Sequence, residues 1–159
     1  MKAATIKELK DELRERPRQE ILDLCLRLAR FKKENKELMT YHLFESEDEV
    51  AYIQGIENQV DEQFDQINRK NYYFIKKGVR KILKEVKKYI RYSPKKETEV
   101  ELLLYFCHKL QNIRPSMYRN KVLVNTFKRQ VQLIKNRVSM LHEDLQFEYN
   151  EQLEEMQTR

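Results

Sequence analysis

The stretch VELLLYFCHKLQNI, residues 100–113, decides the fold. Its apolar side chains point almost all the way round a helix of about 3.6 residues per turn, so other helices must enclose it. The whole sequence of 159 residues holds only two glycines and three prolines. That is too few for the tight turns of a β-rich or doubly wound α/β domain. The sequence therefore predicts an all-α fold with this helix at its centre.

Local signals for helix ends divide the chain further. A Ser or Thr followed three residues later by Glu predicts capping boxes at Thr5, Ser46 and Thr98. The three prolines fall at expected helix borders, with Pro17 at a first helical position. We expect one irregular bundle over residues 1–159, in which residues 1–32 form a helix-loop-helix subunit. Its six or seven helices are expected at 5–15, 17–32, 35–44, 46–67, 71–92, 96–113 and 117–156.

The last of these segments is a long C-terminal helix. At 1.5 Å per residue it would extend roughly 60 Å, which exceeds a compact domain of this size. Either it bends near Asn136, or its end projects beyond the bundle. In the second case residues 148–159 fray, or they pack on a second copy and form a homodimer.

The charges are concentrated in the middle of the chain. Residues 45–68 hold eight acidic and no basic side chains, whereas residues 69–96 hold twelve basic and one acidic. On a helical wheel of residues 71–92 the basic side chains lie opposite the apolar arc, and Tyr73 falls among them. This arrangement predicts a solvent-facing contact surface, for which the candidate residues are Tyr73, Lys77, Arg80, Lys84, Lys88 and Arg91.

Three interpretations of this surface stay open. It is a solvated face, a site for an acidic protein surface, or a site for nucleic acid, whose phosphates bind by charge and whose bases stack on aromatic rings. The eight nearby carboxylates would repel a phosphate backbone. No membrane contact is expected, because the apolar arc is needed for the core. The sequence thus predicts a binding or interaction protein, with nucleic-acid binding as the alternative.

Signals for catalysis are absent from the sequence. The histidines, His42, His108 and His142, lack the Glu-x-x-His and His-Glu-x-x-His spacings of metal sites. There is no nucleophile elbow, phosphate loop or Cys-x-x-Cys pair. We therefore predict no catalytic residue, cofactor or metal, and place His108 in or beside the core. An enzyme with a site built from distant residues is a third alternative, and it would need a pocket that joins His42 or His108 to carboxylates.

The remaining features concern location. The first residues contain no apolar signal segment, and no run approaches the ~18 uncharged apolar residues of a membrane span. Cys25 and Cys107 lie far apart in apolar runs, and we expect both to be buried reduced thiols. Together these features predict a cytoplasmic protein.

The chain resembles two known families in parts of its sequence. Residues 4–13, ATIKELKDEL, followed by Ile21, Leu24 and Leu28, resemble the SAP motif, a helix-loop-helix that binds DNA. The linking residues 14–18 lack the glycine of that family. The resemblance implies DNA contact by the N-terminal helical pair, whose basic residues are Lys7, Lys10, Arg14, Arg16 and Arg18. Residues 24–38 and 72–77 are similar to a bacterial family of small, uncharacterised helical proteins, which implies a bacterial cytoplasmic protein and no particular activity.

Overall fold

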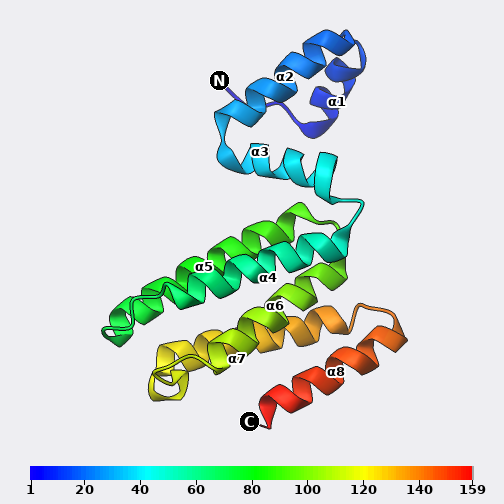
Figure 1. The fold of residues 1–159 in the computed structure, drawn as a ribbon. Coiled ribbons are helices and arrows are strands. Elements are labelled where there is room, and N and C mark those ends of the chain that lie inside the picture. The colour runs from blue at the N-terminus through cyan, green and yellow to red at the C-terminus, as the bar shows by residue number, and fades with distance from the viewer. Residues whose placement is uncertain (159) are drawn as a thin grey trace. The chain divides into compact units, whose positions relative to one another are not determined.

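The computed structural model describes residues 1–158, and these residues form helices and connecting turns without any strand. The prediction of an all-α fold is confirmed (Figure 1). The chain divides into two compact units, Met1–Phe44 and Glu45–Arg159, and each is described by itself. The expectation of a single domain stays a prediction.

The N-terminal unit contains three short helices, α1 (Ile6–Arg14), α2 (Arg18–Phe31) and α3 (Lys33–Thr40), followed by a π-helical turn at Tyr41–Glu45. The capping box at Thr5 is confirmed, because the Thr5 amide donates to Glu8 Oε2 at 2.7 Å and the Glu8 amide donates to Thr5 Oγ1 at 3.3 Å. Pro17 lies just before the first residue of α2. The unit thus begins with two helices joined by a short connection.

The second unit contains five longer helices and one short turn, which are α4 (Glu49–Asp65), α5 (Tyr72–Tyr92), α6 (Lys96–Gln111), a 3₁₀ turn at Met117–Arg119, α7 (Lys121–Val138) and α8 (Glu143–Gln157). The α4 and α5 helices run antiparallel as a hairpin (Figure 1). The α6 helix packs against α4, α5 and α7, while α8 packs against α7. The prediction of a central helix near residues 96–113 is confirmed.

Buried apolar side chains hold these helices together. The ring of Phe106 on α6 is fully buried, and its centroid lies 5.8 Å from that of Phe64 on α4. The α5 helix contributes an apolar stripe at the spacing of three and four residues that one helix face requires, namely Ile75, Val79, Ile82 and Val86. The apolar arc expected on α5 therefore faces the core.

The turn between α4 and α5 explains a glycine inside α5. The Asn71 side chain accepts from the Phe74 amide at 3.2 Å and so caps α5. A Cβ atom at Gly78 would lie 2.9 Å from Cγ1 of Ile67, which the turn brings against the helix. Glycine permits this close approach despite its cost in helix propensity.

Two of the three expected capping boxes are wrong. The α4 helix is capped by Asp48, which accepts from the Ala51 amide at 3.0 Å, and Ser46 lies outside it. Thr98 is buried inside α6, where its hydroxyl donates to Glu49 Oε1 at 2.5 Å. The Ser93 hydroxyl also donates to Glu49 Oε1. The Glu49 carboxylate, which the sequence pattern assigned to a capping box with Ser46, thus joins the start of α4 to the start of α6.

The single long C-terminal helix is wrong as well. Its residues form α7 and α8, which are separated by a break just after the expected bend near Asn136. The His142 imidazole caps the second helix by accepting from the Asp144 amide at 3.4 Å. The break lets α8 fold back on α7, so that Tyr149, Leu153 and Met156 are buried. Residues 148–157 are therefore packed rather than projecting, and Arg159 lies outside the described residues.

Candidate interaction groove

The basic face predicted on α5 is largely open. Tyr73, Lys77, Arg80, Lys84 and Arg91 are exposed. Lys88 is half-buried, and its Nζ lies 4.9 Å from the centroid of the Tyr89 ring. Within residues 1–158 none of the four cations other than Lys88 forms an ion pair. These four charges are therefore available to a ligand.

A groove of about 760 Å³ runs along one side of this face. Its walls are α5 and α7, and α6 lies at its base. The α5 wall presents Arg80, Lys84, Lys87 and Arg91, at the spacing of four, three and four residues that places them in one row. Arg129 faces them from α7. The structure thus brings three predicted residues, Arg80, Lys84 and Arg91, to one site.

The other predicted residues lie outside this groove. Tyr73 and Lys77 occupy the first turns of α5, and Lys88 contacts Tyr89. The Tyr73 ring packs edge-on against Phe74, with centroids 5.3 Å apart. The aromatic group that the sequence placed among the cations is therefore not part of the groove wall.

The floor of the groove is aliphatic. Leu83 and Ile90 of α5 and Leu133 of α7 are half-buried, and Leu103 of α6 is fully buried beneath them. Polar side chains from α7, Thr126 and Gln130, complete the lining. A ligand in this groove would therefore meet cations at the rim and hydrocarbon at the base.

One carboxylate lines the groove, and it already has a partner. Glu99 Oε2 lies 2.8 Å from Arg137 Nε. This pairing leaves the charges of Arg80, Lys84, Lys87, Arg91 and Arg129 uncompensated around the groove. The electrostatic preference is accordingly for an anionic partner.

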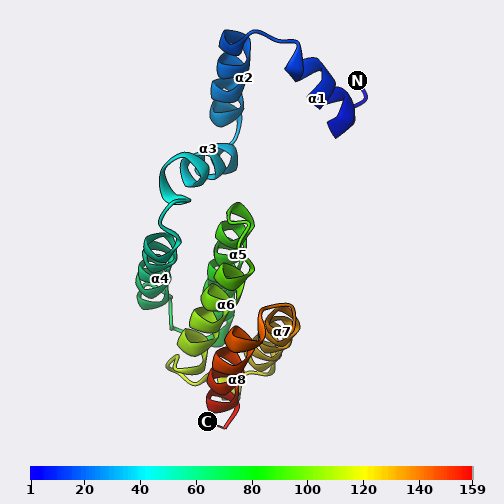
Figure 2. The ribbon, with the colours of Figure 1, turned by 90° about the vertical axis from the view of Figure 1, so that its right-hand side faces the viewer.

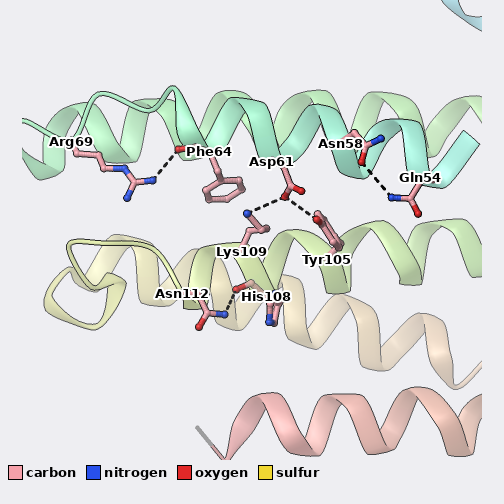
Figure 3. A network of polar contacts seen from close by, with 9 residues as sticks. All are labelled: Gln54, Asn58, Asp61, Phe64, Arg69, Tyr105, His108, Lys109 and Asn112. Atoms are coloured by element: carbon pink, nitrogen blue, oxygen red, sulfur yellow. Dashed lines mark hydrogen bonds and ion pairs between the residues drawn. The ribbon is translucent and has the colours of Figure 1, made fainter.

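The acidic helix α4 faces a different side of α6. Asp61 accepts from the Tyr105 hydroxyl at 2.8 Å and lies 2.9 Å from Lys109 Nζ (Figure 3). Burial acts to raise the pKa of Asp61, but the bonds from Lys109 and Tyr105 prevail and lower it. On the helical wheel Tyr105 points about 160° away from Leu103, which lies in the groove floor. No α4 residue lines the groove, so the expected repulsion by the acidic helix does not apply there.

A second, smaller pocket of about 290 Å³ lies on that opposite side, between α4, α6 and α8. It gathers His108 with Glu57, Glu101 and Glu155. His108 is exposed, so of the two expected positions, in the core or beside it, the core is wrong. Among residues 1–158 no group of three His, Cys, Asp or Glu side chains is placed to hold a metal ion. This pocket brings a histidine beside carboxylates, the combination that the enzyme alternative needs.

Because of the carboxylates in this pocket, the stability of the folded protein depends on pH. Burial, the Glu101 charge and the Asp61 charge all raise the pKa of Glu57. Because the pKa of Glu57 is higher in the folded than in the unfolded state, the folded chain is most stable at a pH below the unfolded-state pKa. Its stability then falls as pH rises through the folded-state pKa. We expect Glu57→Gln to raise the melting temperature at pH 7 by about 1–2 °C.

The same substitution should give no gain at a pH below the ordinary glutamate pKa of 4.5, where Glu57 is protonated in both states. Thermal melts followed by circular dichroism at both pH values measure the difference. The matched control is Glu62→Gln, since Glu62 is exposed on the same helix. An equal gain at both pH values would contradict the electrostatic origin.

The groove contains residues that the sequence reasoning missed. Lys87 was visible in the row of cations at 80, 84, 87 and 91, but it was not chosen as a candidate. Arg129, Leu103 and Leu133 carry no such signal, because their place beside α5 depends on how α6 and α7 pack.

Comparison with protein-family models, with curated proteins and with solved structures finds no match. Within the described residues no helix is long and apolar enough to cross a membrane.

Proposed function

We propose that this chain is an interaction protein whose groove between α5 and α7 binds an acidic amphipathic helix of a partner protein. The observation that carries the proposal is the combination of an aliphatic floor with a cationic rim, in which the one carboxylate, Glu99, is already paired. Such a helix presents apolar residues on one face and carboxylates at its flanks, which matches both parts of the groove.

The dimensions of the groove suit a partner helix of three to four turns. Arg80 and Arg91 are separated by eleven residues on α5, or about 16 Å along the helix axis. Leu83 and Ile90 lie seven residues apart in the same groove, which is the two-turn repeat of an apolar stripe. A partner helix lying along α5 would place its own apolar stripe over these side chains.

The composition of the groove favours a peptide over nucleic acid. Single-stranded nucleic acid is held by stacking of bases on aromatic rings in addition to phosphate contacts. The groove is lined by aliphatic side chains, and no aromatic residue is among them. Nucleic-acid binding, by this face or by the N-terminal helices, is retained as an outcome of the test.

The test measures fluorescence anisotropy with a synthetic peptide of about 14 residues, long enough for four helical turns. The peptide carries Leu at one face and Glu at its flanks. We expect binding that weakens as salt rises from about 50 to 200 mM. The variant Arg80→Glu, Lys84→Glu, Arg91→Glu should weaken binding roughly 100-fold, because like charges are then apposed.

Three controls separate the alternatives. The variant Lys121→Glu, Lys128→Glu, Lys135→Glu changes the net charge equally on exposed α7 positions outside the groove, and it should bind normally. A peptide with Ser in place of Leu should not bind. Equal binding of the Ser peptide, tighter binding of an oligonucleotide of the same charge, or no binding in about 50 mM salt would overturn the proposal.

A further inference from the structure

The N-terminal unit exposes many apolar side chains and buries almost none. The α1, α2 and α3 helices contain no buried residue, and Tyr41 in the turn that follows is the exception within the unit. Apart from Met1, the large apolar side chains exposed in this unit are Ile6, Leu9, Leu13, Leu22, Leu24, Leu26, Leu28, Phe31, Leu38, Leu43 and Phe44. A stable unit of this kind requires something that covers these side chains.

The α2 helix shows how much is uncovered. On a helical wheel its apolar residues span about 220°, from Leu26 round to Phe31, and its charged residues apart from Arg18 in the first turn occupy the rest. One neighbouring helix covers a stripe of about 100°, so two neighbours leave part of this arc uncovered. With α1 and α3 in place, Leu22, Leu24, Leu26 and Leu28 remain 41–49% exposed.

The α1 helix leaves room for another neighbour. Its apolar residues Ile6, Leu9 and Leu13 form one narrow stripe. Leu9 and Leu13 line a depression of about 330 Å³ together with Ile21 and Leu24 of α2. Figure 2 shows that α1 diverges from α2 beyond the connection that joins them. The two helices form an open hairpin with an apolar interior.

The small size of the unit indicates association with another chain, because no internal disulfide or metal site within the described residues 1–44 stabilises it. Units near 40 residues usually need a disulfide, a metal or oligomerisation to fold. Cys25 is a free thiol, and the described residues contain no metal cluster. These helices depend on a partner that packs on their exposed apolar side chains, so that partner must be permanently bound. Most permanent assemblies are formed by copies of one chain.

The exposed area and the charges fit a second copy. The eleven side chains expose on the order of 1,000 Å² in total, compared with the roughly 800 Å² that each partner buries in a standard interface. Residues 1–44 carry eleven basic and eight acidic side chains, interspersed along the helices. Two copies of this unit can therefore pack together without strong charge repulsion. Two basic α5 faces, by contrast, would repel each other because their charges have the same sign.

We propose that Met1–Phe44 is a dimerisation unit, in which the open α1–α2 hairpins of two copies close into a four-helix bundle. In such a bundle each α2 lies between its own α1 and a helix of the other copy, and both parts of its wide apolar arc are covered. The interface differs from the one expected at the C-terminal helix, and it is independent of the function proposed for the groove.

Light scattering coupled to size exclusion tests the proposal with the full chain. We expect a mass twice the 19.6 kDa of one chain. The variant Leu22→Gln, Leu26→Gln, Leu28→Gln should return the mass of one chain. The matched control Val50→Gln, Met140→Gln, Phe147→Gln changes exposed apolar residues of the second unit, including one on α8, and should stay dimeric.

A second measurement, chemical cross-linking, does not depend on substitutions that could unfold the chain. Cys25 lies within the apolar arc of α2, whereas Cys107 is fully buried and burial raises its thiol pKa to about 12. A short bismaleimide should therefore link two chains through Cys25, and Cys25→Ser should abolish the link. A monomeric wild-type chain, a triple-glutamine variant that remains dimeric, a control variant that dissociates, or cross-linking that Cys25→Ser leaves unchanged would each overturn the proposal.

Discussion

Replacement of Phe106 by alanine is expected to lower the free energy of unfolding by about 3–5 kcal/mol. The ring is fully buried on the helix that packs against three others, and it contacts Phe64 across the seam with α4. Its removal leaves a cavity that the surrounding helices cannot fill without moving. Since a domain of this kind has a total stability of about 5–15 kcal/mol, the variant loses a large part of it.

Urea denaturation followed by far-ultraviolet circular dichroism measures this change. The matched control is Phe147→Ala on α8, because Phe147 is 70% exposed. The control should change the free energy of unfolding by at most about 0.5 kcal/mol. If the two variants lost the same stability, α6 would not be the centre of the core.

Replacement of Gln111 by leucine is expected to cost about 1–3 kcal/mol and to loosen the end of α8. The buried Gln111 amide donates to the Met156 carbonyl at 2.8 Å and to the Tyr118 hydroxyl at 2.9 Å. Met156 lies in the last turn of α8, where backbone carbonyls have no partner within the helix. Leucine fills the same volume but leaves this carbonyl unsatisfied.

Hydrogen exchange resolves this effect along the chain. Faster exchange should be confined to the amides of α8, while those of α5 and α6 stay protected. Gln132→Ala is the control, because Gln132 is exposed and bonds to Asn136 within its own helix. Unchanged exchange in α8 would show that the helix is held by its apolar contacts alone.

The sequence predicted the features that depend on spacing within one helix. Apolar residues on all sides of the helix at 100–113 identified the central helix. The apolar stripe on α5 identified the side of α5 that faces the core. The polar residue Thr5 marked a true helix start. These predictions succeeded because each rests on contacts between residues a few positions apart.

The features that the sequence missed depend on tertiary contacts. Thr98 matched a capping pattern, yet its hydroxyl binds Glu49 of another helix. The bend expected near Asn136 is instead a full break before His142, which contains no proline or glycine and lets α8 bury Tyr149 and Leu153. The groove was missed for the same reason, since Arg129 joins the α5 cations only after α6 and α7 pack.

The groove and the His108 pocket place charges of opposite sign on two sides of α6. Five uncompensated cations surround the groove on one side of α6, and Glu57, Glu101 and Glu155 gather on the other. An acidic partner approaching within the ~8 Å screening length of physiological salt would be rotated before it touches the surface. Long-range orientation of this kind raises the association rate more than it prolongs the bound state. If the groove binds the acidic helix that we propose, the charge pattern would govern how quickly that partner finds the groove, and the aliphatic floor would govern how long it remains.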